Sequence, residues 1–270
     1  MKKFSLAWLP LALALPLSAA TTTLTFHGHA AWELTTPKGR VLFIDPWLSN
    51  PQNPDKKPLE SAKKADYILI THGHFDHVGD AVALAKKTKA RLVTNFELGT
   101  NMARLLDYPA DQMGFDTLMN VGGRVALADG EVVVEMTPAI HSSGLDTKDA
   151  KAPMAYGGEP AGFLIRIKDG PTIYDTGDTA YFRDMDQLGT ADVDVALINI
   201  GGHFGMEPDA AAMAARAVNP RLVIPQHFGT FPILTQDPAP FFKELDDDKI
   251  PHRLMKPGDV LSFNGREPQP

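Results

Sequence analysis

The stretch Ile68-Leu69-Ile70-Thr71-His72-Gly73-His74-Phe75-Asp76-His77 gathers three histidines and one aspartate within six residues, directly after an apolar run. The segment from 66 to 71 predicts a buried strand. Placing so many titratable groups at the end of a buried strand is unfavourable unless something pairs with them. A metal ion is the expected partner, because imidazole and carboxylate groups are common metal ligands. A lone histidine such as His252 is instead expected to be an ordinary surface or core residue.

The chain around this stretch alternates between strand and helix patterns, in two blocks of similar order. The first block predicts strands at 22–27, 31–34, 41–45, 66–71 and 91–94, a loop at 46–58, and helices at 79–89 and 97–106. The second predicts strands at 131–137, 161–168, 171–174, 194–200 and 221–224, and a helix at 208–218. Because strands come first and β-α units follow in each block, we expect two sheets packed face to face with helices outside. The predicted fold is a four-layer αββα sandwich of the α/β class, formed by residues 21–270 as one domain.

The spacing of the histidines predicts a first ion site. Two residues at positions i and i+2 of an extended segment point the same way, so His72 and His74 can bind one ion together. Gly73 between them lets the backbone approach the metal closely. His141, which follows another apolar strand, is the expected third ligand.

A second site is predicted beside the first. Asp76 and His77 are displaced from the first pair by the turn and are expected to face a second ion, with His227 completing the site. Asp178 is expected to lie between the two ions as a bridging carboxylate. All of these donors are nitrogen or oxygen, which suit Zn²⁺, Mn²⁺ and Fe²⁺, and there is no sulfur ligand to favour zinc. Two divalent ions are expected, with Zn²⁺ as the first choice and Mn²⁺ and Fe²⁺ left open.

The N-terminal segment has the pattern of a secretory signal peptide. Lys2 and Lys3 precede an apolar run over 4–17, and the small residues Ser18-Ala19-Ala20 suit cleavage near Ala20. The alternative is an uncleaved membrane anchor, but two prolines interrupt the run and it is shorter than the ~20 apolar residues of a spanning helix. The chain has no cysteine, which excludes a lipid anchor on cysteine. Residues 1–20 are therefore predicted to direct the protein to the periplasm or the medium, without stable membrane insertion after cleavage.

Charge restricts the class of partner. The formal net charge is −7 at pH 7, and it becomes −9 once the two lysines of the leader are removed. A nucleic-acid partner needs an extended basic surface, and the lysine clusters here are short. We therefore expect a small-molecule substrate and no nucleic acid, while the oligomeric state stays open.

The ordered set His72-x-His74-x-Asp76-His77, a later histidine, a Gly-Asp pair and a final histidine resembles the metallo-β-lactamase superfamily over nearly the whole mature chain. Further motifs resemble the branch of metal-dependent hydrolases related to ascorbate-6-phosphate lactonase: Gly28-His29-Ala30, Ile44-Asp45-Pro46, 176–179, 200–204 and 227–232. That branch is usually cytoplasmic, and the export signal of this chain departs from it.

The resemblance implies a mechanism and roles for several residues. Two ions would share a water, lower its pKa and direct the hydroxide at a carbonyl or phosphoryl centre, with Asp76 holding one ion and orienting the hydroxide. His29 and Asp45 would fix ligand histidines by hydrogen bonds; the alternative is that both face water at strand ends. His203 is expected to contact the substrate or donate a proton, with a helix-cap or packing role as the alternative.

The predicted function is metal-dependent hydrolysis of an ester, lactone, amide or phosphodiester bond. A di-iron or mononuclear-iron redox enzyme of the same superfamily is one alternative, although its di-iron members resemble each other in having Glu where this chain has His74. A non-catalytic metal-binding scaffold is the other, and the complete ligand set argues against it. The identity of the substrate is not predicted, because specificity depends on loops such as 46–64 and 142–160.

Overall fold

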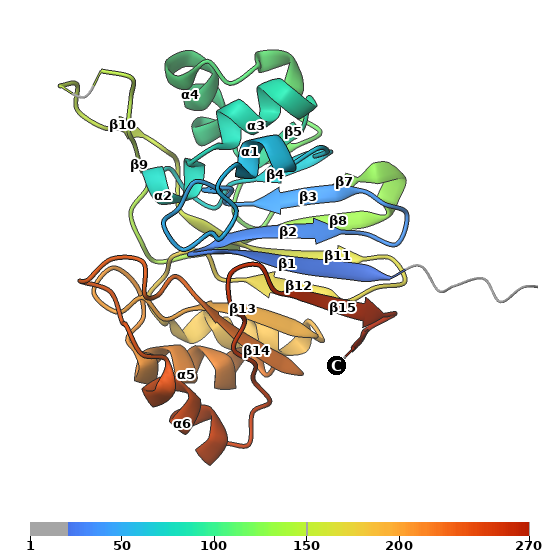
Figure 1. Cartoon of the computed structure of the whole chain (residues 1–270), viewed down its shortest axis with the longest axis vertical. Helices are drawn as coiled ribbons and strands as arrows, with labels where there is room; N and C mark the ends of the chain where they lie inside the picture. The colour runs from blue at the N-terminus through green and yellow to red at the C-terminus, as the bar shows by residue number, and fades with distance from the viewer. Residues whose placement is uncertain (1–20, 150, 270) are drawn as a thin grey trace, which may run out of the picture.

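Two β-sheets face each other at the centre of the molecule, and helices cover the outer face of each (Figure 1). This computed structural model describes residues 21–149 and 151–269, so the predicted signal peptide lies outside the described residues. Helix, sheet, sheet and helix form the four layers of the predicted αββα sandwich. The predicted fold class is therefore confirmed.

The first sheet has eight strands in the order β16-β15-β1-β2-β3-β4-β5-β6. They are β1 (Thr22–Gly28), β2 (Ala31–Thr35), β3 (Val41–Ile44), β4 (Tyr67–Leu69), β5 (Arg91–Asn95), β6 (Leu118–Met119), β15 (Val260–Asn264) and β16 (Glu267–Pro268). Strands β3, β4 and β5 are parallel. Their carboxyl ends therefore meet at one edge of the sheet.

The second sheet has six strands in the order β14-β13-β12-β11-β8-β7. They are β7 (Arg124–Leu127), β8 (Val132–Pro138), β11 (Ala161–Ile167), β12 (Thr172–Asp175), β13 (Val195–Asn199) and β14 (Leu222–Gln226). Strands β12, β13 and β14 are again parallel. A separate two-stranded hairpin consists of β9 (Gly144–Leu145) and β10 (Ala155–Tyr156).

The helices divide between the two sheets. Those that follow strands of the first sheet are α1 (Pro58–Ser61), α2 (Phe75–Val78), α3 (Ala81–Thr88) and α4 (Phe96–Leu106). Those that follow strands of the second sheet are the 3₁₀ segment η3 (Arg183–Thr190), α5 (Pro208–Val218) and α6 (Ala239–Asp247); η1 (Ala110–Gln112) and η2 (Ala128–Gly130) are single 3₁₀ turns. Local chemistry sets their ends: the Asn95 side chain accepts a hydrogen bond from Leu98 N at the start of α4. Pro208 occupies the first turn of α5, where its missing N–H has no helical partner to lose.

Strand alternation distributes the apolar side chains among three buried layers. On β3, Leu42 and Ile44 pack between the sheets, whereas Val41 and Phe43 pack outward with α3 and α4. The third layer lies between the second sheet and α5 with α6. Trp32 is fully buried between the sheets, and its indole N–H donates to Gln226 Oε1 at 2.5 Å. Burial of a side chain of this kind contributes about 1.5–3 kcal/mol.

Every strand and helix expected from the sequence is present, with shifted ends. The sequence pattern predicts no element over 239–270, where the structure has α6, β15 and β16. It predicts a plain loop over 46–58, where α1 begins at Pro58. Strand β15 pairs with β1 and extends the first sheet. No helix among the described residues has the length and apolar character of a membrane-spanning segment.

Candidate metal centre

The predicted ligands lie together at one end of the two sheets, where α2 is labelled in Figure 1. They follow β4 of the first sheet and β8, β12 and β14 of the second, so the first sheet contributes one segment and the second contributes three. This is the end at which the parallel strands of both sheets terminate, and α/β folds commonly bind ligands there. The structure therefore brings together all seven predicted ligands: His72, His74, Asp76, His77, His141, Asp178 and His227.

The backbone of the histidine segment changes conformation partway along. His74 is extended, with φ −66° and ψ 151°, and α2 begins at the next residue. The first two histidines therefore share one side of an extended segment, while Asp76 and His77 project from a helical turn. Gly73 passes so close to the hairpin that a Cβ there would lie 3.1 Å from Gly144 O. A larger residue here would therefore push against the backbone of the hairpin.

His72, His74 and His141 form the first group of possible ligands. His72 Nε2 lies 2.9 Å from His74 Nδ1, and the His141 ring centroid is 5.1 Å from each of the other two. Burial lowers the pKa of all three imidazoles, and that of His72 is well below its ordinary value. Neutral imidazoles have a free lone pair, which is the form that binds a metal.

Asp76, His77 and His227 form the second group, and His29 lies with them. Burial would lower the pKa of both histidines, but neighbouring carboxylates outweigh it: the pKa of His77 lies well above its ordinary value, and that of His227 rises to about 9. Burial likewise opposes ionisation of Asp76, yet the neighbouring His227, whose Nε2 is 3.7 Å from Asp76 Oδ2, and the hydrogen bond from His29 hold its pKa below the ordinary range.

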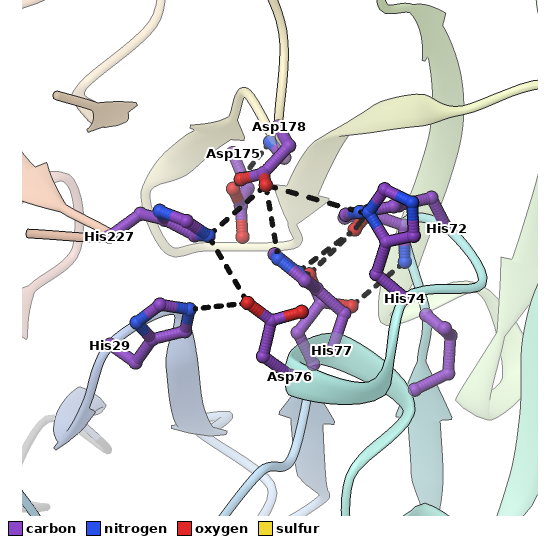
Figure 2. A network of polar contacts seen from close by, with 12 residues as sticks. His29, His72, His74, Asp76, His77, Asp175, Asp178 and His227 are labelled. Carbon is purple, nitrogen blue, oxygen red and sulfur yellow. Dashed lines mark hydrogen bonds and ion pairs between the residues drawn. The ribbon is translucent and has the colours of Figure 1, made fainter. Parts of the chain in front are cut away.

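Asp178 lies between the two groups (Figure 2). Its Oδ2 is 3.9 Å from His72 Nε2 and 3.6 Å from His141 Nε2, and it is 3.4 Å from His77 Nε2 and 3.1 Å from His227 Nε2. Tetrahedral ligands about 2.0–2.2 Å from an ion are about 3.3–3.6 Å apart. The spacing of these atoms is therefore that of donors arranged around ions.

Two nitrogen atoms provide an independent test of whether the residues fit a metal. The Nε2 atoms of His77 and His227 are buried and have no hydrogen-bond partner, although both lie near Asp178. Leaving such atoms unpaired normally costs about 1–3 kcal/mol each. Nitrogen and oxygen atoms that lie close together without hydrogen bonds to one another can each direct a lone pair at a cation between them. The residues present therefore suit divalent metal ions.

Asp45 holds His77 in place. Its Oδ2 accepts hydrogen bonds from His77 Nδ1 at 2.7 Å and from Thr71 Oγ1 at 2.6 Å, and its Oδ1 accepts one from Thr71 N at 2.8 Å. This orientation turns His77 Nε2 towards Asp178. Such carboxylate-to-imidazole contacts fix the tautomer and direction of metal ligands.

The contact of His29 differs from the prediction. Its Nε2 donates to Asp76 Oδ2 at 3.1 Å, so its side chain orients a carboxylate and does not hydrogen-bond to a ligand histidine. Its Nδ1 is paired with Thr230 Oγ1 at 2.8 Å. Its hydrogen bond to a histidine is made by its backbone carbonyl, which accepts from His227 N at 2.7 Å, while its ring packs against the His227 ring with centroids 3.9 Å apart. The difference arises because β1 ends beside α2, which brings the imidazole of His29 next to Asp76. Burial and the neighbouring His227 lower the pKa of His29 to about 4.

Three residues of this centre have a strained backbone. His29, Asp45 and His227 have φ values of 57°, 43° and 62°, in the left-handed region that side chains rarely adopt. Each such residue costs about 1–3 kcal/mol and persists only where the surroundings enforce it. The fold thus accepts strain to aim these three side chains.

Some contributing residues were missed by the sequence analysis. Asn199 at the end of β13 donates from Nδ2 to Asp178 Oδ1 at 3.1 Å, and Ser142 Oγ lies 3.3 Å from His74 Nε2. Asn199 is the one polar residue in the apolar run 195–200, and that isolated polar position was the available signal. For Ser142 the sequence offers no comparable signal.

His203 is placed apart from the other predicted residues. Its side chain is exposed and packs edge-on against Phe204, with ring centroids 4.6 Å apart. Within residues 21–149 and 151–269 it has no hydrogen bond or ion pair with the cluster. The turn through Gly201 and Gly202 directs it outward, so its role in contacting substrate stays a prediction.

Comparison with known proteins agrees with this geometry. The profile of the Beta-lactamase superfamily domain matches residues 40–228. A UPF0173 metal-dependent hydrolase from Thermodesulfovibrio yellowstonii is 45% identical over 259 residues, covering 95% of this chain and 96% of that protein. Another UPF0173 metal-dependent hydrolase, from Anaeromyxobacter sp. strain K, is 51% identical over 245 residues, covering 90% and 87%.

A solved structure is similar as well. Igni18, described as a metallo hydrolase from Ignicoccus hospitalis, superposes with a TM-score of 0.77 at 32% identity, covering 90% of this chain and 98% of that one. The comparisons do not test the narrower resemblance to the branch related to ascorbate-6-phosphate lactonase, which stays a prediction. The matched domain includes the ligand segments from His72 to His227. The chain therefore belongs to the metallo-β-lactamase superfamily and, within it, to the UPF0173 family of metal-dependent hydrolases.

Proposed function

We propose that this protein is a two-metal hydrolase that cleaves an ester, lactone, amide or phosphodiester bond of a small molecule, and that it acts after export to the periplasm or the medium. The position of Asp178 carries the proposal. Its Oδ2 is within 3.9 Å of an Nε2 atom of four histidines, two from each group. A single carboxylate oxygen shared in this way has the position of a ligand that bridges two ions.

Two divalent ions held at these groups would supply Lewis acidity and lower the pKa of a water molecule towards neutrality. The side chains of the chain position the reactants. Asp76 remains ionised at neutral pH because its pKa is lowered, so it can accept a hydrogen bond from the attacking water and orient it. His29 fixes the carboxylate of Asp76, and Asp45 fixes His77.

The donor set bears on the metal. All donors are imidazole nitrogen or carboxylate oxygen, and the chain has no cysteine that could provide a thiolate. Such sites accept Zn²⁺, and they also accept Mn²⁺ and Fe²⁺. Zinc is the metal that we propose, because hydrolysis needs a Lewis acid and no change of oxidation state.

Elemental analysis of protein purified without added metal or chelator tests the proposal, combined with assays of a generic ester and a generic phosphodiester on the same sample. We expect about two equivalents of zinc or manganese together with turnover. Iron with oxygen uptake and no hydrolysis would favour the redox alternative. A protein that takes up no metal even when it is supplied would overturn the assignment of the site.

Export requires its own test. Expression of the full chain in a Gram-negative host, followed by fractionation and N-terminal sequencing, should give a periplasmic protein that begins at Thr21. A control chain that starts with Met followed by Thr21 should stay in the cytoplasm. Recovery of the full chain in the cytoplasm with its leader intact would refute export while leaving the metal site unaffected.

A further inference from the structure

Three aromatic side chains gather beside the metal centre. They come from separate segments: Trp47 from the loop after β3, Phe75 from the first position of α2, and Phe231 from the loop after β14. Trp47 and Phe231 are stacked, with centroids 5.8 Å apart and planes at 17°. Phe75 lies 5.7 Å from Trp47 and 6.3 Å from Phe231. We refer to Trp47, Phe75 and Phe231 as the aromatic trio.

The aromatic trio adjoins the cluster through His29. The His29 ring packs edge-on against Trp47 at 5.2 Å and against Phe231 at 6.0 Å. The same imidazole donates to Asp76, and Phe75 directly precedes Asp76 in α2. A molecule whose reacting bond is held near Asp76 would therefore have the trio within reach.

The exposure of the trio argues for a ligand. Phe75 is 54% exposed, and Trp47 and Phe231 are partly exposed. If the three rings served only to shield His29 from water, their own side chains would be expected to be buried. Exposed apolar groups that converge from three segments beside a polar site are typical of ligand-binding surfaces.

A small cavity extends this apolar surface. Phe75 also lines a hollow of about 200 Å³ whose walls include Val78, Leu106 and Leu145. Lys148 lies at the same hollow but is ion-paired with Asp107. An aryl or alkyl group can therefore find apolar surface on more than one side of Phe75.

The charges around the cluster limit the chemistry of the ligand. Among the described residues, no lysine or arginine forms a hydrogen bond or ion pair with the predicted ligands, His29 or Asp45, whose ionic partners are histidines and aspartates. Sites for phosphorylated molecules usually supply arginine or lysine for the phosphate oxygens. The surroundings of this centre instead suit an uncharged molecule.

We infer that the aromatic trio binds the aryl or alkyl part of an uncharged ester, lactone or amide and thereby determines the specificity of the hydrolase. The inference rests on the proposed function for the reaction itself. The inferred substrate class is a neutral carbonyl compound with an apolar group close to the scissile bond. Phosphorylated compounds are outside that class.

A pair of substrates isolates the contribution of the trio: methyl 3-phenylpropanoate and methyl propanoate have the same leaving group and differ by one phenyl ring. Burial of the ring should raise kcat/KM about tenfold to a hundredfold for the first ester. Phe75→Ala and Phe231→Ala should each lower this ratio at least about threefold, and the double variant should bring it close to one. The ratio of the two kcat/KM values does not depend on the fraction of a variant that is folded, because both esters are tested on the same protein. Phe115→Ala is the matched control, because Phe115 is 90% exposed and stacks on Phe96 away from the trio.

Binding to the metal-free protein separates failure of the inference from failure of the proposed function. Trp47 is partly exposed and Trp32 is buried, so tryptophan fluorescence should report 3-phenylpropanamide at the trio. We expect saturable quenching by this amide and none by propanamide, with affinity reduced about tenfold in Phe231→Ala. If the amide binds but neither ester is cleaved, the hydrolase proposal fails and the binding surface stands.

Two results would overturn the inference. One is an equal kcat/KM for the two esters, with unchanged ratios in the trio variants and no quenching by the amide. The other is hydrolysis of 2-phenylethyl phosphate in preference to methyl 3-phenylpropanoate, because it would place a phosphorylated compound in a centre without a lysine or arginine partner.

Discussion

The two sheets contribute ligands to the same centre in different ways. The first sheet supplies His72, His74, Asp76 and His77 from one continuous segment after β4. The second supplies His141, Asp178 and His227 from the segments after β8, β12 and β14, which are far apart in the sequence. Ligands of the first kind are aligned by local backbone conformation, whereas ligands of the second kind are aligned by strand pairing. The half of the centre that comes from the first sheet is therefore a local structure, whereas the half that comes from the second sheet depends on the whole fold.

The strongest test removes the local half. Replacing His72 and His74 together by Ala should abolish metal uptake at the first group and hydrolytic activity, because three nitrogen donors are reduced to one. Metal content and turnover measure the effect, and circular dichroism with thermal unfolding checks that the fold is kept. Normal turnover in the double variant would refute the assignment of these ligands.

The next test removes the residue that joins the halves. Asp178→Ala should lose the paired arrangement of ions, leaving at most about one equivalent per chain, with a large fall in kcat. Asp178→Asn keeps the shape of the side chain and serves as the comparison. Two ions retained with full activity in either variant would disprove the bridging position.

Smaller effects are expected from the residues that orient ligands, one in each half. Asp45→Asn should weaken metal affinity about 10–100-fold, because the buried carboxylate accepts three hydrogen bonds and fixes His77. Asn199→Ala should cost less, because Asn199 makes one hydrogen bond to Asp178. Competition with a chelator measures both affinities, and the reverse order would contradict the ranking.

The contact between the sheets can be tested by stability. Trp32→Phe removes the donor to Gln226 Oε1 and leaves that buried oxygen unpaired, which should lower the free energy of unfolding by about 1–3 kcal/mol. Gln226 also donates to Asp175 Oδ1 at 2.7 Å, near the strand end that leads to Asp178. Denaturant unfolding of the metal-free protein measures the change. A change below about 0.5 kcal/mol would show that this hydrogen bond does not stabilise the sandwich.

The smallest effect is expected at His203. Its exposed side chain has no polar contact with the centre, so His203→Ala should change kcat/KM by less than about threefold. The pH profile of kcat/KM should also be unchanged. A fall in kcat/KM of about a hundredfold would instead support the predicted role of His203 as a proton donor.

Much of the architecture was predictable because its signals are periodic and local. Apolar runs and apolar alternation identified the central strands, and helical patterns identified α3, α4 and α5. The strand β15 and helix α6 are short, and both are held in place by tertiary contacts that the sequence pattern does not show: β15 pairs with β1, and α6 packs through Phe241 and Leu245.

The sequence by itself determined the fold class, the metal-binding character and the seven candidate ligands, because these polar residues lie in short segments that follow apolar strands. Only the tertiary structure decided how far those residues lie from one another. It placed Asp178 within reach of four histidines, turned His29 towards Asp76, and gathered Trp47, Phe75 and Phe231 from three separate segments. The physical reason is that periodicity is a property of neighbouring residues, whereas the distance between strand ends is set by the order and register of the sheets.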